Sequence, residues 1–385
     1  MEGYMSKKFL YLVLFAAALA VSAAENVKLM IPEVIYAVPG VEMNVYFNNI
    51  VTVINPANYV FDVTCPKGRN DLKRWRFTPT DKDVGTYKWA IEVIGMNGVI
   101  ASAETKLVVL PKNAGEGKKL TMLIIGASQT MEGFYPLRLA RLMSAPGNPE
   151  LKLIGSKQRN IARHEGYGGW KWDTFLTRYK PAPKKNADGM HPDRPVGFSS
   201  PFLFPGKDGK PVFDLDRYFK IHNDGKVPDI VSFQLGINDI FKCTEKNIAE
   251  GTAKSLENME LLVNKFRELK PAPQIVIFQH IPGAGQDAFG RAYKCGRTTW
   301  QFRNNLDYYN RALLKKAKSM NLTVIPAYIN IDTEHNFSIK EEEINEGNTR
   351  KIFRQRDGLH PVPAGYYQMG DTLYCHLKAL ISKMK

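Results

Sequence analysis

Residues 120–130 read Leu-Thr-Met-Leu-Ile-Ile-Gly-Ala-Ser-Gln-Thr, an apolar run followed by a glycine and a serine. The apolar run, residues 120–125, predicts a buried strand, and Gly126 with the polar residues after it predicts a turn into a helix. Ser128 then lies at the carboxyl end of a strand, the edge at which open α/β sheets bind ligands. A serine at the start of a helix is more often only an N-cap, so this stretch alone assigns Ser128 no function.

The sequence after this stretch alternates strands with helices. We predict strands at residues 151–154, 230–235, 274–279 and 323–325, and helices after Ser128, at 257–269, at 306–320 and from 364 onward. Such alternation predicts βαβ units, a parallel sheet and helices on both faces of the sheet. Residues 180–229 are rich in proline and glycine and weakly periodic, which predicts a long loop over the sheet edge or the rim of a site.

The sequence before residue 112 has a different pattern. Short strands separated by turns are predicted at residues 34–36, 42–47, 59–63, 87–94 and 105–110, with no helical periodicity between them. The run Asp83-Val84-Gly85-Thr86-Tyr87 resembles the tyrosine corner of immunoglobulin-like sandwiches, although the cysteine pair of antibody domains is missing. We therefore predict a small Ig-like β-sandwich at residues 25–111, a linker at 112–119 and an α/β domain at 120–385. A packing or spacer role is the commoner one for such a module, and sugar binding is the alternative.

The N-terminal end has the pattern of a signal peptide. Lys7 and Lys8 precede an uncharged run at residues 9–20, and the small residues 21–24 suit cleavage just before Glu25. The apolar run is too short to span a bilayer comfortably and no second one follows, so a membrane anchor is the weaker interpretation. Residues 1–24 are therefore expected to be removed and the product to be secreted or periplasmic.

Composition indicates a globular protein with a basic surface. The 385 residues are 44% hydrophobic and 24% charged, with a formal net charge of +15. Outside the cell, a basic surface favours anionic partners such as acidic polysaccharide, anionic lipid or envelope polymer. The basic residues are spread along the chain without a nucleic-acid-binding motif, so no nucleic-acid partner is expected and a solvated basic surface is the simpler interpretation.

The four cysteines permit one disulfide bond in an oxidising compartment. Cys243 and Cys295 each follow a predicted strand on the same edge of the sheet, and we predict that they pair. Cys65 and Cys375 are expected to be buried thiols. The histidines other than His360 lack metal-ligand spacing with nearby Cys, Asp or Glu residues, so no metal site is predicted.

Three later segments bear on Ser128. The first, residues 164–170, contains the adjacent glycines Gly168 and Gly169, which let the backbone approach a ligand closely. The second, Gly236-Ile237-Asn238-Asp239, follows a predicted strand and places an amide at the same sheet edge as Ser128. The third, Asp357-Gly358-Leu359-His360, precedes the last helix. Each alone also fits a tight loop, a turn residue, or a helix-start carboxylate beside an exposed histidine.

Together with Gly126–Thr130, these segments resemble the four blocks of the SGNH (GDSL-like) hydrolase family, in the family's order. The resemblance spans roughly residue 119 to the C-terminus and implies a flavodoxin-like, three-layer α/β/α domain. One position departs from the family pattern: Ala127 stands where the family usually has aspartate. That aspartate is not a triad member, so its loss is expected to change loop hydrogen bonding more than chemistry.

The resemblance implies a cofactor-free carboxylic ester hydrolase with a Ser-His-Asp triad. Ser128 is then the nucleophile, His360 its general base, and Asp357 the carboxylate that orients the imidazole. Three donors are expected to stabilise the negative charge of the tetrahedral intermediate: the N–H groups of Ser128 and Gly169, and the side-chain amide of Asn238.

The substrate we expect is an acylated carbohydrate, neutral or anionic, from which the enzyme removes an acetyl or other short acyl group. Export, the β-rich module and the basic surface motivate this expectation. Trp170, Trp172 and Trp300 are candidates to stack on sugar rings or to wall the pocket, and His280 is a candidate to border it. The alternatives are a lipolytic esterase or thioesterase, a non-catalytic carbohydrate-binding protein, and transfer of the acyl group to a sugar instead of water.

Overall fold

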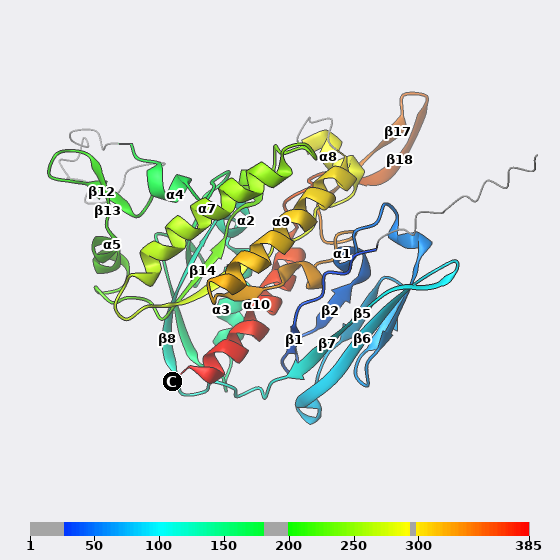
Figure 1. Ribbon diagram of the computed structural model, residues 1–385, viewed down its shortest axis with the longest axis horizontal. Helices are drawn as coiled ribbons and strands as arrows, with labels where there is room; N and C mark the ends of the chain where they lie inside the picture. The colour runs from blue at the N-terminus through cyan, green and yellow to red at the C-terminus, as the bar shows by residue number, and fades with distance from the viewer. Residues whose placement is uncertain (1–26, 181–198, 293–297, 385) are drawn as a thin grey trace, which may run out of the picture.

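The computed structural model describes residues 27–180, 199–292 and 298–384. Within them an α/β domain packs beside a pair of smaller β-sheets formed by the N-terminal part of the chain (Figure 1). The predicted signal peptide, residues 1–24, lies outside the described residues. None of the helices in the described ranges is long and apolar enough to cross a membrane.

The α/β domain is built on a central parallel sheet. Its five main strands lie in the order β9 (Glu150–Ile154), β8 (Lys119–Gly126), β14 (Ile230–Gln234), β15 (Gln274–Phe278) and β16 (Thr323–Ile325). In chain order this is 2-1-3-4-5, the flavodoxin-like arrangement, which confirms the predicted fold class. The amino-terminal part of β8 pairs with β9, and its carboxyl end pairs in parallel with β11 (Ala162–Gly166). The edge strand β10 (Lys157–Arg159) pairs with β11 in antiparallel orientation.

Both faces of this sheet are covered by helices. Along β8, Met122 and Ile124 belong to one core and Leu123 and Ile125 to the other, as the alternation of a strand requires. The first core is closed by α3 (Phe134–Met143) and α10 (Pro363–Lys383), and the second by α7 (Ile248–Arg267) and α9 (Thr299–Ser319) (Figure 1).

Two predicted helices begin earlier than their apolar periodicity suggested. The start of α9 is marked by a capping box, in which the Thr298 hydroxyl accepts from the Gln301 N–H and the Gln301 side chain accepts from the Thr298 N–H. Before residue 257, α7 buries Ile248, Thr252 and Ser255, of which only Ile248 is apolar. Polar caps and buried polar positions carry no apolar periodicity, so a search for that periodicity starts both helices too late.

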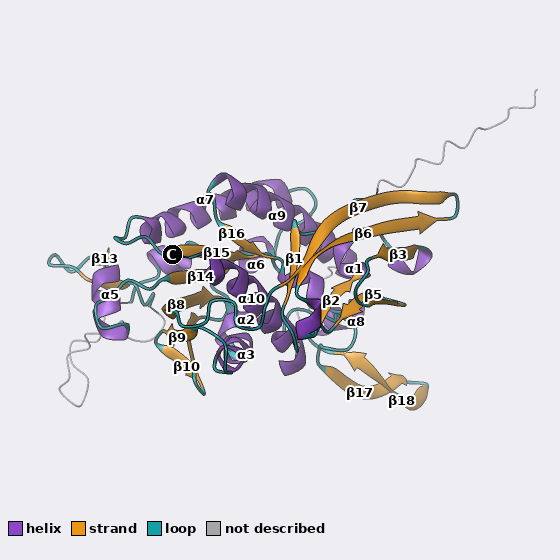
Figure 2. Cartoon of the chain, turned by 90° about the horizontal axis from the view of Figure 1, so that it is seen from below, coloured by secondary structure: helices purple, strands orange, loops and turns teal. Residues whose placement is uncertain are grey.

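Several short elements escaped prediction. The loop predicted at residues 180–229 contains, in its described part, a small hairpin and a helix: β12 (Leu203–Pro205), β13 (Pro211–Phe213) and α5 (Leu215–His222). A second hairpin projects from the body just before Asp357: β17 (Ile339–Asn345) and β18 (Asn348–Gln355) (Figure 2). Of the remaining short helices, α2 (Ser128–Met131) begins where a helix was predicted, whereas four were not predicted: α1 (Phe47–Ile50), α4 (Thr174–Thr177), α6 (Ile237–Ile240) and α8 (Gln286–Ala292).

The N-terminal part forms two sheets, as its strand pattern predicted. One has the order β1 (Val34–Ala37), β7 (Gly98–Val109), β6 (Gly85–Gly95), β3 (Val60–Thr64), and the other β2 (Met43–Tyr46), β5 (Arg74–Phe77), β4 (Arg69–Asp71). The buried rings of Trp75 and Trp89 lie edge to face, with centroids 6.1 Å apart. The Tyr87 hydroxyl donates to the Asp83 carbonyl at 3.0 Å, the bond a tyrosine corner requires. An Ig-like identity for this module stays a prediction.

The N-terminal sheets share a continuous hydrophobic core with the α10 side of the α/β domain. The predicted linker at residues 112–119 packs on α10: the Lys118 ammonium donates to the Ile381 carbonyl at 2.9 Å. A Cβ on Gly115 would lie 2.9 Å from the Ile381 side chain, so this position requires close approach. The module is therefore packed onto the α/β domain along this segment.

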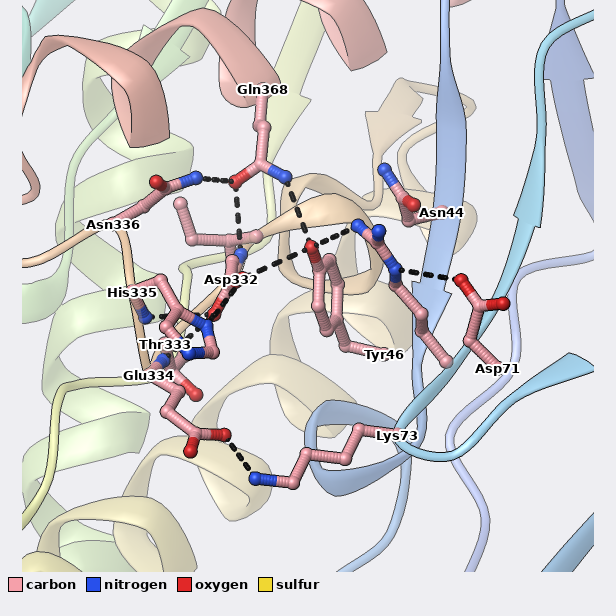
Figure 3. A network of polar contacts seen from close by, with 12 residues as sticks. Asn44, Tyr46, Asp71, Lys73, Asp332, Thr333, Glu334, His335, Asn336 and Gln368 are labelled. Atoms are coloured by element: carbon pink, nitrogen blue, oxygen red, sulfur yellow. Dashed lines mark hydrogen bonds and ion pairs between the residues drawn. The ribbon is translucent and has the colours of Figure 1, made fainter.

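A polar network ties the two parts together at a second place (Figure 3). The Tyr46 hydroxyl, on β2, donates to Asp332 at 3.3 Å and accepts from Arg74 at 2.8 Å. The Gln368 amide, on α10, receives the Asp332 N–H at 2.9 Å and donates to the Tyr46 hydroxyl at 3.4 Å. The N-terminal sheets thus hold the loop from which the β17–β18 hairpin runs toward Asp357.

Candidate active site

Ser128, His360 and Asp357 lie in line at the carboxyl edge of the central sheet. Ser128 is the first residue of α2, directly after β8, and the other two occupy the loop before α10. The Ser128 Oγ is 2.8 Å from His360 Nε2, and His360 Nδ1 is 3.0 Å from Asp357 Oδ2. The second Asp357 oxygen accepts from the N–H groups of Leu359 and His360, which fixes the carboxylate. The structure therefore brings together the three residues predicted as a triad.

The turn that presents Ser128 depends on a glycine and on backbone bonds. A Cβ on Gly126 would lie 1.9 Å from the Thr130 hydroxyl, so only glycine fits there. The Ala127 carbonyl accepts from the N–H groups of Thr130 and Met131, which turns the chain into α2. The buried Ala127 methyl packs in the α7–α9 core. The turn is therefore closed without an aspartate side chain at this position.

Gly169 and Asn238 lie on two loops that contact each other. The Asn238 amide donates to the Trp170 carbonyl at 2.9 Å, and Gly169 adopts a left-handed φ of 74° with open space where a Cβ would lie. Within residues 27–180, 199–292 and 298–384, neither the Ser128 N–H nor the Gly169 N–H donates a hydrogen bond to another group. Both amides are thus available to a ligand oxygen, as the oxyanion prediction requires.

Trp170 and Trp172 are buried, so their prediction as sugar-stacking residues is wrong. Trp170 stacks on Tyr167 with ring centroids 4.1 Å apart, and the Trp172 indole N–H donates to the Tyr309 hydroxyl at 3.3 Å. A buried aromatic ring removes a large apolar area from water, and a buried indole N–H usually finds a hydrogen-bond partner. These two side chains support the loop that carries Gly169.

His280, predicted to border the active-site pocket, is also part of the interior. Its Nε2 lies 2.9 Å from the Leu235 carbonyl, and its Nδ1 lies 3.1 Å from the Gln234 amide. Burial lowers the pKa of this imidazole to about 4, so it is neutral at pH 7.

Gln234 extends this contact into a chain that sequence analysis missed. It donates to the Gln129 side chain at 2.6 Å, and Gln129 in turn donates to the Leu359 carbonyl at 2.9 Å. The chain therefore runs from His280 to the loop between Asp357 and His360. Its only sequence signal is position, since Gln129 follows Ser128 and Gln234 ends a strand.

Glu165 is a second buried polar residue that sequence analysis missed. Its carboxylate accepts from the Ser156 N–H and hydroxyl and from the hydroxyls of Tyr167 and Tyr218, at 2.5 to 2.7 Å. Burial raises the pKa of this carboxyl, while these donors lower it. The contacts anchor the start of the loop that leads to Gly169.

The last two predicted site residues to be placed are Trp300 and Cys243. Trp300 is 36% exposed in the first turn of α9 and borders, with His280, a cavity whose lining does not include the triad residues. Cys243 is buried, and Cys295 lies outside the described residues. The Cys243–Cys295 disulfide stays a prediction.

Asp239, beside Asn238, gives a pH-dependent contribution to stability. Burial, and then the nearby carboxylate of Asp173, raise the pKa of Asp239 from 3.8 to about 7. The folded state thus binds this proton more tightly than the unfolded state, so the contribution is full below about pH 4 and is lost as the pH rises through about 7. As the pH rises from 5 to 8, wild type should therefore lose stability that Asp239→Asn keeps. We expect the difference in stability between the two proteins to change in favour of Asp239→Asn by on the order of 2–4 kcal/mol.

Thermal unfolding of both proteins at the two pH values measures this difference. The buried histidines are common to both proteins, so their titration cancels. A difference in stability between the two proteins that stays constant from pH 5 to pH 8 would contradict the prediction.

Comparison with known proteins decides the family. The model of the family described as GDSL-like Lipase/Acylhydrolase matches residues 123–373, a range that contains the site from Ser128 to His360. The chain belongs to this family. No curated protein matches the sequence.

Solved structures resemble the chain at low identity. A carbohydrate esterase family 3 protein from Talaromyces cellulolyticus has 15% identity and a TM-score of 0.40, over 69% of this chain and all of that one. A carbohydrate acetylesterase family member from Sinorhizobium meliloti has 15% identity and a TM-score of 0.40, over 68% of this chain and 99% of that one. The family match alone makes this chain a GDSL-type esterase, and a further β-rich module lies at its N-terminal side.

Proposed function

We propose that this GDSL-type esterase hydrolyses carboxylic esters with Ser128 as nucleophile. The observation that carries the proposal is the continuous contact from the Ser128 Oγ through the His360 imidazole to the Asp357 carboxylate. A serine hydroxyl is a poor nucleophile at neutral pH and needs such a base. Asp357 and His360 side chains each keep 31% of their area exposed, so a substrate has access to the base.

In the proposed reaction, the Ser128 oxygen attacks the ester carbonyl while its proton passes to His360 Nε2. Asp357 stabilises the imidazolium, and the N–H groups of Ser128 and Gly169 with the Asn238 amide receive the oxyanion. Collapse of this intermediate breaks the bond to the alcohol, which takes the proton from His360. Water then attacks the acyl-serine with His360 again as base, releasing the acid and restoring Ser128.

The substrate we propose is an acetylated or otherwise short-acylated carbohydrate met outside the cytoplasm. The predicted signal peptide, the attached β-rich module and the net charge of +15 support this choice. Export to the periplasm or the medium is part of the same proposal, and fractionation of the producing cell tests it.

Acyl-chain selectivity separates a deacetylase from a lipolytic enzyme or thioesterase. We expect kcat/KM to fall about 10-fold or more from p-nitrophenyl acetate to p-nitrophenyl octanoate. The added methylenes overfill a site shaped for acetyl, and overfilling costs about 1–3 kcal/mol. The measurement is initial-rate kinetics across the acetyl, butyryl and octanoyl esters. Rates that rise with chain length would favour the lipolytic alternative.

Release of acetate from acetylated glycans is the matching experiment on natural substrates. A panel of neutral and acidic acetylated polysaccharides, each compared with its deacetylated form, identifies the carbohydrate. Absence of release from every glycan, with p-nitrophenyl acetate still hydrolysed, would contradict the carbohydrate assignment and leave the esterase assignment intact.

A further inference from the structure

The cavity that Trp300 and His280 border lies at the carboxyl edge of the central sheet, between the N-terminal module and α9. Its volume is about 140 Å³, and it is bordered by α1, by His280 and Pro282 after β15, and by the first turn of α9. The loop that contains Pro282 also contacts the catalytic loop, because the Ala284 N–H donates to the Gly358 carbonyl at 3.0 Å. One short loop therefore borders this cavity and also contacts the loop that carries Asp357 and His360.

The cavity keeps a positive charge. Arg303, on its wall, donates to the Asn48 carbonyl at 2.8 Å and to the Asn49 side chain at 3.4 Å, both neutral groups. Burial lowers the pKa of this guanidinium to about 10, which leaves it charged at pH 7. Asp307 also borders the cavity, but its carboxylate pairs with Arg311 at 2.8 Å. The amino-terminal end of α9, which favours anions, lies at the same wall.

Two buried polar atoms of residues that border the cavity have no partner among the described residues: the Asn48 Oδ1 and the Thr299 Oγ1. The Asn48 amide nitrogen donates to the Thr333 hydroxyl at 3.2 Å, which fixes the side chain and leaves its oxygen in need of a donor. A buried acceptor without a donor costs about 1–3 kcal/mol, so the wall of the cavity beside Asn48 carries an uncompensated polar group.

The rim adds an aromatic surface. Trp300, 36% exposed, stands one turn of α9 before Arg303 and borders the same cavity. Its ring offers an apolar face of the kind on which a sugar ring packs. The cavity is below the roughly 300 Å³ of a site for a drug-sized ligand, which suits a single ring.

We propose that this cavity is a subsite for one carboxylate-bearing sugar residue. The carboxylate pairs with Arg303, and the ring packs on Trp300. This proposal deepens the proposed function and rests on it for the connection to catalysis, which runs through the contact between the Ala284 N–H and the Gly358 carbonyl of the catalytic loop.

Direct binding to the full-length protein tests the subsite independently of catalysis. Calorimetric titration with tetragalacturonate, which carries no ester, is compared with titration by a neutral galactose tetrasaccharide. We expect the acidic probe to bind at least about 10-fold more tightly, because a charge-assisted contact contributes about 1.5–3 kcal/mol. Free galacturonate is the third probe: binding as tight as that of the tetramer assigns the cavity to the free sugar acid, and weaker binding assigns it to a glycan chain.

Substitutions locate the binding. Arg303→Gln should weaken tetragalacturonate binding about 10–100-fold with little effect on the neutral probe. Because Arg303 also contacts α1, the partly exposed Trp300→Ala is the second variant, with an expected loss of about 3–10-fold. Lys315→Gln removes one positive charge from an exposed position on the same helix and should change neither binding nor ester hydrolysis.

Equal binding of the acidic and neutral tetrasaccharides, or binding unchanged by both Arg303→Gln and Trp300→Ala, would overturn the subsite. Hydrolysis of p-nitrophenyl acetate by the wild-type protein is recorded beside the titrations. A protein that binds tetragalacturonate as expected but lacks esterase activity would contradict the proposed function alone.

Discussion

Replacing Ser128 by alanine is expected to lower kcat for p-nitrophenyl acetate by on the order of 10⁵–10⁶-fold. The substitution removes the hydroxyl oxygen that lies 2.8 Å from His360 Nε2, so no acyl-serine forms. Any remaining acceleration over uncatalysed hydrolysis in water would come from the donors around Gly169 and Asn238. Initial rates, with burst amplitude as a count of reactive sites, measure the effect.

The fold should survive this substitution. The Ser128 side chain is partly exposed, and the turn around it is closed by the backbone bonds of Ala127. Thermal unfolding within a few degrees of wild type is the expected control. Ser144→Ala, at an exposed serine after α3, is the matched variant and should retain full activity. Activity retained in Ser128→Ala would exclude Ser128 as the nucleophile.

Asn238→Ala is expected to lower kcat by about 10²–10³-fold, the usual cost of losing one oxyanion donor. One N–H of this amide is engaged by the Trp170 carbonyl at 2.9 Å, which leaves the other for the oxyanion. The substitution therefore removes a donor and also releases the loop that carries Gly169. Because both effects act mainly in the transition state, KM should change much less than kcat.

Asn238→Asp separates the donor from the shape of the side chain. It keeps the size of the amide but offers only acceptors when ionised, so its kcat should fall at least as far as that of Asn238→Ala. Asn58→Ala, at an exposed asparagine of the N-terminal module, is the matched control. A kcat of Asn238→Ala within about threefold of wild type would exclude the side chain as an oxyanion donor.

Local patterns were sufficient for the strands of the central sheet and for the pieces of the site. The buried strands β8, β14 and β15 are apolar because both of their faces are covered, and such runs are visible in a single sequence. Ser128, Asn238 and the Asp357–His360 pair each follow a strand or precede a helix at a sheet edge, and the resemblance of their motifs to the SGNH family predicted their roles. The order of the four motifs along the chain then suggested that they meet.

Packing between distant segments decided the rest. Trp170, Trp172 and His280 were expected at the active-site rim, but whether a ring is covered depends on elements far along the chain, such as Tyr309 and Leu235, which no local pattern reveals. The Gln129–Gln234 chain, the buried Glu165 and the cavity around Arg303 were not predicted either, because they too depend on contacts between segments that are distant in the sequence. The sequence by itself determined the strands and the chemical groups of the site; tertiary structure alone decided which groups are buried, because burial is a property of contacts between residues remote in sequence.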